Sequence, residues 1–441
     1  LLLGVVYVNL DPKAPKERQK KILAASKAVM VFGSSGTLKE NIWINKEFKG
    51  DVFNLNIECQ LKHTKNISKA LPRPEHPILS TDPAYLMFTS GSTGTPKGAV
   101  MTHGNVSNFL NWSIKEFSIT SKDNLSNVNP MFFDNSVFDF YTALFSGACL
   151  LSVNAELSRR PRDMVKFLTK HSCTVWFSVP SMLVYTLRLR AFGPGSFNML
   201  KWLVFGGEGF PKDSLRKIVG LFPLNTRIMN VYGPTECTCI CSCYEVRNSD
   251  LENDELLPLG SLIDGFKFLI RSLDKSKGLD SLGELLLGGS NVGLGYFNDY
   301  ERSSQSFIQN PNHELYRDIY YCTGDIVEFD SLSGNLIFKG RVDNQIKRMG
   351  FRIELEEIDT VAASINGVTS CAAVWLPERV GRSSCLLLYA SCDGLKKRDI
   401  GEELKARLPY YMQPDEIVLL DKMPLNSNGK VDRKFLKENS K

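Results

Sequence analysis

The glycine-rich loop of residues 89–98, TSGSTGTPKG, restricts the possible folds and functions of this chain more than any other segment. It follows a short apolar run, residues 84–88, that is typical of a buried strand. Glycines let the backbone approach a ligand closely, while the hydroxyls and Lys97 supply donors and a positive charge. The pattern favours a phosphate-binding loop, with a flexible surface loop as the alternative. It is not a P-loop, because Gly91 and Gly94 lie too close together and no Ser or Thr follows the lysine.

The size and charge of the chain exclude several classes of protein. At 441 residues it is too long for one ordinary core, so we expect at least two domains. A net charge of +5 gives no indication of nucleic-acid binding, and no apolar run reaches the roughly 20 residues of a membrane span. Eleven cysteines, an odd number in a long chain, favour a reducing compartment such as the cytoplasm over a disulfide framework.

Four cysteines, Cys237, Cys239, Cys241 and Cys243, alternate with other residues. This spacing predicts that all four lie on one face of a strand. A straight strand cannot fold two thiolates back onto one metal ion. We therefore expect small buried side chains here, with a zinc site as the alternative.

Apolar runs alternate with segments of helical spacing along most of the chain. Strands are expected at residues 4–12, 29–32, 174–179 and 200–205, and helices at residues 16–28, 102–112 and 402–408. This alternation indicates βαβ units and a parallel sheet. A basic, polar segment at residues 340–350 precedes about a hundred residues of mixed helix and strand, so we place the domain boundary between residues 342 and 343.

Several later segments carry side chains that suit a nucleotide. Asp134 stands between aromatic residues, where its burial is costly unless a cation meets it or it caps a helix. Residues 229–236 place an amide, an aromatic ring, a hydroxyl and a carboxylate on one strand-to-turn segment, which suits a nucleobase and Mg²⁺; a plain turn is the alternative. Residues 321–325 end in an acid that suits a ribose diol or a simple glycine turn. Taken alone, Lys430 resembles an ordinary surface lysine.

Taken in order, these motifs resemble the core motifs of the acyl- and aminoacyl-adenylate-forming enzymes. The matching segments are residues 89–98, 133–137 (FDNSV), 232–236 (YGPTE), 321–325 (YCTGD), 340–343 (GRVD) and 428–430 (NGK). This superfamily includes acyl-CoA synthetases, firefly luciferase and the adenylation domains of nonribosomal peptide synthetases. The resemblance covers nearly the whole chain, and by that comparison we expect the large domain to be incomplete at its N-terminal side.

The resemblance implies an α/β fold in two parts. Residues 1–342 would form a large domain of stacked, helix-flanked sheets, and residues 343–441 a small, mobile α+β domain. It also implies a two-step reaction with ATP and Mg²⁺: a carboxylate attacks the α-phosphate to give an acyl-adenylate and pyrophosphate, and a thiol then takes the acyl group. The protein must bring two anions together and stabilise the charge that develops at phosphorus.

The resemblance also assigns roles to individual residues. The residues implied for the β- and γ-phosphates are Ser90, Thr93 and Lys97. The residues implied for catalysis are Thr235 on the α-phosphate, Glu236 on Mg²⁺, and Lys430 between the α-phosphate and the substrate carboxylate. The residues implied for the nucleoside are Gly207, Glu208, Asn230 and Tyr232 around adenine, and Asp325 and Arg341 on the ribose. Asp343 would be the hinge, and residues 350–354 would line the path of the thiol.

Asp134 indicates which acid is activated. It occupies the position at which amino-acid-activating members of the superfamily keep an aspartate for the substrate α-ammonium group. Such an ammonium would also compensate a buried carboxylate. The remaining pocket, aligned by motif, consists of Asn135, Phe138, Phe177, Val204, Gly206, Val231, Cys239 and Ile240. It is mostly apolar and has no charged side chain, so it favours a small or medium-sized neutral amino acid.

The segments around residues 232–236 and 340–347 are similar to those of D-alanine–carrier protein ligases. Those ligases usually have a cysteine where this chain has Gly206, a difference that would enlarge the pocket and argues against D-alanine itself. We expect the acceptor to be the phosphopantetheine thiol of a carrier protein or domain. Two alternatives remain: an acyl-CoA synthetase for a non-amino acid, and a non-catalytic nucleotide-sensing or scaffolding subunit, against which Lys97 and Lys430 both argue.

Overall fold

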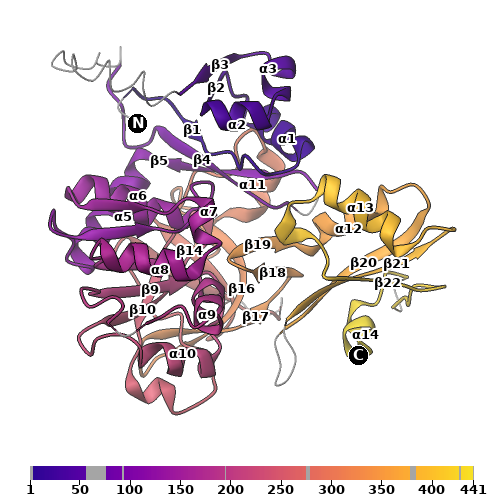
Figure 1. Cartoon of the computed structure of the whole chain (residues 1–441). Helices are drawn as coiled ribbons and strands as arrows, with labels where there is room; N and C mark the ends of the chain where they lie inside the picture. Colours follow the sequence, from indigo (N-terminus) through magenta and orange to yellow (C-terminus); the bar gives the residue numbers. More distant parts are fainter. Residues whose placement is uncertain are drawn as a thin grey trace.

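The chain forms a large α/β domain followed by a small C-terminal domain, which Figure 1 shows in yellow beside the larger body. The computed structural model describes residues 3–55, 76–91, 94–193, 195–274, 279–377, 384–426 and 429–440. Within those ranges, no helix combines the length and apolar character that crossing a membrane requires. The predicted α/β class, with one large and one small domain, is confirmed.

The main sheet of the large domain has seven strands in the order β12-β11-β10-β9-β8-β6-β7. Its strands are β6 (Asn124–Asn127), β7 (Cys149–Ser152), β8 (Val175–Ser178), β9 (Trp202–Gly206), β10 (Arg227–Tyr232), β11 (Ser242–Glu245) and β12 (Ser261–Leu262). Strands β6 to β10 are parallel to one another, whereas β11 runs antiparallel to β10, and β12 runs antiparallel to β11. The helices along this part of the chain are α5 (His103–Glu116), α6 (Asn135–Ser146), α7 (Ala155–Ser158), α8 (Pro161–Lys170), α9 (Pro180–Arg188) and α10 (Lys212–Val219). The predicted parallel βαβ arrangement is thus correct for this region.

Within the described part of the chain, three smaller sheets complete the large domain. One contains β1 (Tyr7–Val8), β4 (Pro83–Thr89) and β5 (Lys97–Thr102), and a parallel pair contains β2 (Met30–Gly33) and β3 (Asp51–Asn54). The antiparallel sheet contains β13 (Phe266–Arg271), β14 (Leu282–Gly289), β15 (Phe307–Gln309), β16 (Ile319–Asp330) and β17 (Asn335–Arg341). The remaining helices are α1 (Lys16–Ser26), α2 (Ser35–Glu40), α3 (Trp43–Glu47), α11 (Tyr300–Ser306), and the 3-10 turns η1 (Thr235–Cys237) and η2 (Asn248–Leu251).

The glycine-rich loop connects β4 and β5, which pair as an antiparallel hairpin with Thr89 opposite Lys97. Lys97 is therefore the first residue of a strand, and the pairing fixes its position. A side chain at Gly91 would place its Cβ 2.2 Å from the carbonyl oxygen of Thr95, so only glycine lets the loop fold back this tightly.

Alternate side chains of β9 enter two separate cores on the two faces of the main sheet. Trp202 and Val204 belong to the core beneath α5 and α6, whereas Leu203 and Phe205 belong to the core that includes α8 and α10. A strand buried on both faces explains why its sequence is apolar throughout.

Replacing the fully buried Leu203 with alanine should reduce the free energy of unfolding of the large domain by about 2–5 kcal/mol, because it leaves a cavity. Urea unfolding would measure the change. Leu224→Ala is the matched control: its side chain is fully exposed, and the expected change is within about 0.5 kcal/mol. Equal effects of the two substitutions would contradict the assignment of Leu203 to a core.

The C-terminal domain has its own core. Its elements are β18 (Gln345–Arg348), β19 (Phe351–Glu354), α12 (Leu355–Ala363), β20 (Val368–Leu376), β21 (Cys385–Cys392), α13 (Lys397–Arg407), η3 (Tyr410–Met412), β22 (Glu416–Leu419) and α14 (Arg433–Glu438). Its main buried cluster lies between Phe351 and Met412, and Phe132 and Phe133 of the large domain pack against it. A second buried cluster extends to Leu436. The packing of Phe132 and Phe133 places the small domain directly over the segment that contains Asp134.

The predicted strand through the four alternating cysteines is wrong. Cys237 lies in η1, and Thr238 and Cys239 have positive φ angles of 57° and 74°, so the chain reverses sharply before β11. The reversal brings the Cys241 N–H back to donate to the carbonyl oxygen of Tyr232 at 2.8 Å. Cys237, Cys239 and Cys241 are buried, and no group of three metal-ligating side chains occurs among the described residues.

Candidate active site

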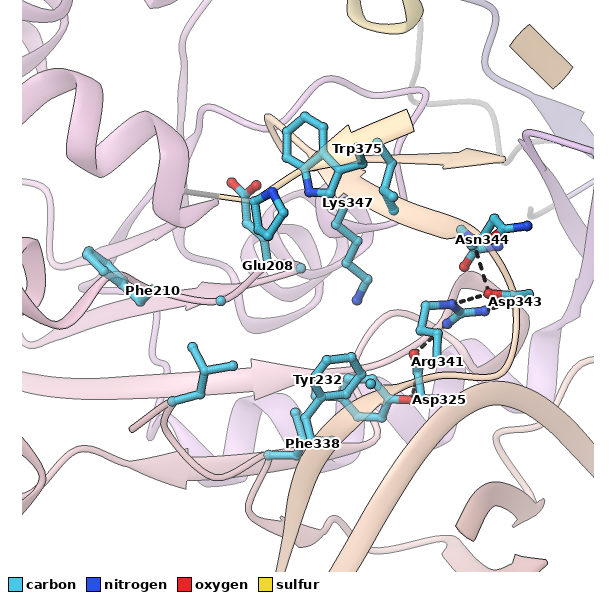
Figure 2. A pocket seen from close by; sticks show the side chains of 18 of the residues that line it. Glu208, Phe210, Tyr232, Asp325, Phe338, Arg341, Asp343, Asn344, Lys347 and Trp375 are labelled. Carbon is cyan, nitrogen blue, oxygen red and sulfur yellow. Dashed lines mark hydrogen bonds and ion pairs between the residues drawn. The ribbon is translucent and has the colours of Figure 1, made fainter. Parts of the chain in front are cut away.

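A cavity of about 570 Å³ lies at the carboxyl ends of β9 and β10. Its large-domain wall contains Gly207, Asn230 and Tyr232, and its other wall contains Lys347 and Trp375 of the C-terminal domain (Figure 2). The carboxyl edge of a parallel sheet is where such folds commonly bind ligands. The cavity therefore lies between the two domains, at the place that the sequence motifs predict for a nucleotide.

A smaller cavity of about 70 Å³ shares part of this lining and reaches the glycine-rich loop. The predicted site residues that line it are Ser90, Asp134, Asn135, Gly207, Tyr232, Thr235, Asp325 and Arg341. Residues that are far apart in sequence, from Ser90 to Arg341, thus surround one continuous region.

A chain of polar contacts joins Tyr232, Asp325, Arg341 and Asp343 along one side of the larger cavity (Figure 2). Tyr232 Oη donates to Asp325 at 2.5 Å, and Arg341 forms an ion pair with the other oxygen of the same carboxylate. Arg341 also binds Asp343, with distances of 2.6 and 2.7 Å. Burial and then the Asp325 charge raise the pKa of Tyr232 well above its usual value, so its hydroxyl remains a donor. The two residues predicted for the ribose are therefore held rigidly beside the residue predicted for adenine.

Lys347 covers the ring of Tyr232, a contact that the sequence motifs did not reveal. Its Nζ lies 5.4 Å from the ring centroid, within the range of a cation–π interaction. Burial lowers the pKa of Lys347 from its usual value, and the negative charge of Asp325 opposes this effect. In this arrangement, the ring face that was predicted for adenine faces an ammonium group from the C-terminal domain.

The side chains of Glu208 and Asn230 have structural partners. Glu208 accepts from the backbone N–H of Ser181 at 2.9 Å, at the start of α9, and Asn230 Nδ2 donates to the carbonyl oxygen of Pro258 at 2.8 Å. Gly207 has a φ of +92°, which favours glycine at this turn out of the sheet. The backbone of Gly207 and Glu208 therefore lines the cavity. The hydrogen bond between Glu208 and Ser181 holds this backbone in place.

Asp134 and Thr235 are in direct contact. Thr235 Oγ1 donates to Asp134 Oδ2 at 2.5 Å, and this bond links the predicted ammonium ligand to the predicted α-phosphate ligand. Asp134 immediately precedes α6, but its side chain makes no capping hydrogen bond, so the alternative role as a helix cap is not observed. Burial raises the pKa of Asp134, and the hydrogen bond from Thr235 opposes the rise.

The apolar residues predicted for the substrate side chain lie in one core cluster. Its members include Phe138, Phe177, Val204, Val231, Cys239 and Ile240. The rings of Phe138 and Phe177 meet edge to face, with centroids 5.4 Å apart. At Gly206, an added Cβ would lie 2.2 Å from the backbone oxygen of Val231 and 2.7 Å from its Cγ2. Val231 therefore occupies the space that the Cβ of any side chain at position 206 would need.

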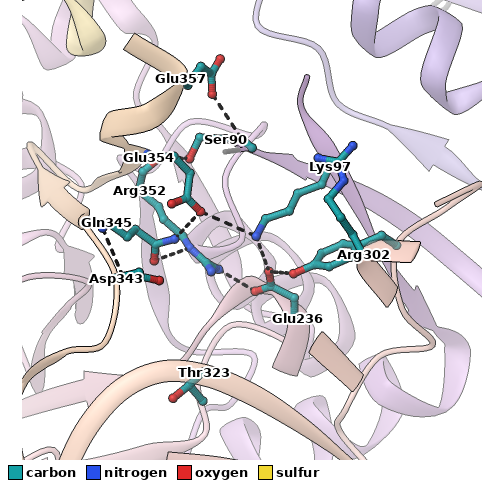
Figure 3. A network of polar contacts seen from close by, with 12 residues as sticks. Ser90, Lys97, Glu236, Arg302, Thr323, Asp343, Gln345, Arg352, Glu354 and Glu357 are labelled. Carbon is teal, nitrogen blue, oxygen red and sulfur yellow. Dashed lines mark hydrogen bonds and ion pairs between the residues drawn. The ribbon is translucent and has the colours of Figure 1, made fainter. Parts of the chain in front are cut away.

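Glu236 is fully buried at the end of the glycine-rich loop (Figure 3). Tyr296 Oη and a guanidinium nitrogen of Arg352 each lie 2.7 Å from its carboxylate, and Lys97 Nζ lies 3.9 Å away. Burial alone would raise the pKa of Glu236, but Arg352 and Lys97 hold it at about 2. A carboxylate that stays ionised in a buried position is suited to bind a cation.

Lys430 is not brought to the site, and Phe138, Phe177, Gly206 and Cys239 of the predicted substrate pocket also line neither cavity. Lys430 is exposed on a turn, where Asn426 Oδ1 accepts its backbone N–H at 3.0 Å, and it lines neither of the two cavities. Thr93 lies outside the described residues. Conversely, the site contains Lys347, for which the only sequence signal was the basic character of residues 340–350, and Arg352, which the resemblance had assigned only to the path of the thiol.

Comparisons with known proteins agree with this geometry. A family model described as AMP-binding enzyme matches residues 1–297. The chain is 32% identical over 436 residues to the L-proline–[L-prolyl-carrier protein] ligase of Pseudomonas fluorescens Pf-5, covering 98% of this chain and 84% of that ligase. It is 30% identical over 442 residues to the D-alanine–D-alanyl carrier protein ligase of Bacillus cytotoxicus, with the same two coverages.

Among solved structures, the chain resembles the adenylation domain AlmE of Vibrio cholerae in complex with glycyl-adenosine-5'-phosphate. The TM-score is 0.82 at 25% identity, covering 99% of this chain and 84% of that one. The match extends over both domains. From the family model, the two ligases and this fold, we conclude that the chain belongs to the AMP-binding enzyme family.

Proposed function

We propose that this protein is an AMP-forming ligase that activates an amino acid with ATP and transfers the aminoacyl group to the phosphopantetheine thiol of a carrier protein. The observation that carries the proposal is the Asp134–Thr235 contact, which joins an acid suited to an ammonium group to the nucleotide cavity. The relatives are named as carrier protein ligases for L-proline and D-alanine, and both substrates are small and neutral. We therefore place a small, neutral amino acid between Asp134 and the apolar cluster.

In this proposal, adenosine occupies the larger cavity, with adenine against Tyr232 and the ribose hydroxyls on Asp325 and Arg341. The phosphates extend toward the glycine-rich loop, where Ser90, Thr93 and Lys97 bind the β- and γ-phosphates. Thr235 contacts the α-phosphate and stabilises the charge that develops there during attack.

Glu236 is our proposed ligand for Mg²⁺. Its ionised carboxylate fits an ion that binds oxygen, and one protein carboxylate suffices for an ion that takes most of its remaining ligands from phosphates and water. Bound there, Mg²⁺ would neutralise the negative charge of the outgoing pyrophosphate. Tyr296 fixes the orientation of the carboxylate.

We further propose that residues 343–441 move as a unit about Asp343. Lys430 lies outside the cavities in the arrangement described above, so adenylation requires that the small domain bring it to the α-phosphate. Residues 350–354, of which Gly350 and Arg352 already line the smaller cavity, would line the path of the thiol. We also propose that the protein acts in the cytoplasm, because its reaction consumes ATP.

Acyl-CoA synthetase activity is the second candidate. In the proposed site, Asp134 is the only residue that distinguishes an amino acid from another carboxylic acid. The test is acceptor choice: radiolabelled amino acid and ATP are supplied with either a phosphopantetheinylated carrier protein or free CoA. Label on the carrier, lost when the carrier lacks phosphopantetheine, supports the proposed ligase. Acyl-CoA formation from simple acids without any amino-acid product would contradict it.

A further inference from the structure

We propose that Asp359 is a positioning residue for the adenylation step, and that it acts through Arg433 to fix the turn that carries Lys430. The inference rests on the proposed function, because it uses the assignment of Lys430 to the α-phosphate. Asp359 lies on α12, and Arg433 is the first residue of α14, three positions after Lys430. Asp359 lines neither cavity, so in this arrangement its effect on the reaction must pass through other residues.

The contacts of Asp359 and Arg433 meet at Ala373 of β20. Among the described strands, β20 is at the edge of a three-stranded sheet in the order β20-β21-β22. Asp359 Oδ1 accepts the backbone N–H of Ala373 at 2.6 Å, and Arg433 Nε donates to the carbonyl oxygen of Ala373 at 3.3 Å. The two side chains therefore satisfy backbone groups that an edge strand would otherwise leave unpaired.

An ion pair between Asp359 and Arg433 closes this arrangement. Arg433 Nη2 binds Asp359 Oδ2, so one guanidinium group is held by acceptors on α12 and on β20. The side chains are 17% exposed for Asp359 and 28% exposed for Arg433. Burial raises the pKa of Asp359 to about 6, and the charge of Arg433 opposes the rise, so the carboxylate is ionised at neutral pH. A planar guanidinium with two acceptors fixes both the position and the orientation of the start of α14.

The turn that carries Lys430 is joined to the start of α14 by short backbone contacts. The N–H of Lys430 donates to Asn426 Oδ1 at 3.0 Å, and the carbonyl oxygen of Lys430 accepts the N–H of Asn426 at 2.7 Å. The N–H of Asp432 donates to the carbonyl oxygen of Pro424 at 2.9 Å. A displacement of Arg433 therefore moves Lys430 with it.

The other contacts of α14 (Figure 1) restrain its orientation less well. The helix has only six residues, too few to be stable by itself, and a cation at its first position opposes the helix dipole. Leu436 packs in an apolar cluster, a contact without directional preference. Ser440 Oγ lies 2.8 Å from Tyr389 Oη, but this contact is at the far end of the helix. Loss of the Asp359 charge should therefore loosen the end of α14 that is next to Lys430.

Replacing Asp359 with asparagine tests the inference, because the amide keeps an acceptor for Ala373 but removes the charge that holds Arg433. We expect single-turnover adenylate formation to slow about tenfold to thirtyfold and the Kd for ATP to stay within about threefold. The substrate is the amino acid that gives the fastest pyrophosphate exchange with the wild-type protein. Glu403→Gln, which breaks an ion pair with Arg407 on α13, is the matched control and should keep the rate within about twofold.

A double-mutant cycle with Lys430→Ala separates positioning from a general loss of structure. If Asp359 acts through Lys430, Asp359→Asn should slow the Lys430→Ala protein by less than about twofold. Hydrogen exchange should be several-fold faster at residues 429–438 in Asp359→Asn and unchanged in β21. An equal loss of rate in both backgrounds, or unchanged exchange at residues 429–438, would overturn the inference.

Failure of the proposed function would give a different result from failure of the inference. If no amino acid supports exchange in the wild-type protein, the proposed function is wrong and the inference with it. If Lys430→Ala keeps the wild-type rate, the assigned role of Lys430 is wrong. A slow Lys430→Ala protein together with an Asp359→Asn protein of wild-type rate would overturn the inference alone.

Discussion

Replacing Lys430 with alanine is expected to lower the rate of aminoacyl-adenylate formation by about 10²–10³-fold, while the Kd for ATP changes by less than about threefold. In the proposed reaction, Lys430 stabilises negative charge at the α-phosphate only as the bond forms, and such contacts act on the rate more than on binding. Single-turnover formation of the adenylate and equilibrium binding of ATP would measure the two effects separately.

Lys434→Ala is the control for this prediction. Lys434 lies four residues away on α14, and its side chain is 85% exposed. We expect its rate and ATP affinity to match the wild-type values within about twofold. A Lys430→Ala protein that retains the wild-type rate would show that the small domain does not bring this lysine to the α-phosphate.

Replacing Asp134 with asparagine is expected to raise the KM for the amino acid by about 100-fold, with the KM for ATP within about threefold of wild type. The amide retains a hydrogen-bond acceptor for Thr235 but leaves the substrate ammonium without a counter-charge in a half-buried site. Exchange kinetics with each substrate varied in turn would separate the two KM values.

Discrimination between an amino acid and its deamino analogue sharpens this test. If Asp134 binds the ammonium group, the preference for alanine over propionate should fall sharply in Asp134→Asn. A variant that keeps this preference, or whose KM for ATP rises as much as that for the amino acid, would show that Asp134 has another role.

The sequence predicted those parts of the fold that local patterns determine. The apolar runs at residues 84–88, 174–179 and 200–205 became β4, β8 and β9, because a strand buried on both faces must be apolar throughout. The alternating cysteines between residues 237 and 243 did not become a strand. Alternation carries no information about the positive φ angles of Thr238 and Cys239, which a tight reversal imposes.

The ordered motifs predicted candidate site residues, whereas the contacts that form where the two domains meet were not predicted. Tyr232, Asp325 and Arg341 were recognised from their motifs, and the structure places them in one hydrogen-bonded chain. The pairing of Glu236 with Arg352 joins residues 116 positions apart, and that of Gly91 with Glu357 joins residues 266 positions apart. Sequence gives the charges of such residues, but only the docking of one domain on the other determines their partners.

Amino-acid-dependent exchange of radiolabelled pyrophosphate into ATP tests the central claim most directly, because it requires reversible formation of an aminoacyl-adenylate. The panel should contain the twenty common amino acids and D-alanine, with simple carboxylic acids as the comparison set. We predict Mg²⁺-dependent exchange with one or a few small, neutral amino acids and none with the acids that lack an amino group. Exchange with the simple acids alone, or with no compound in either set, would contradict the account.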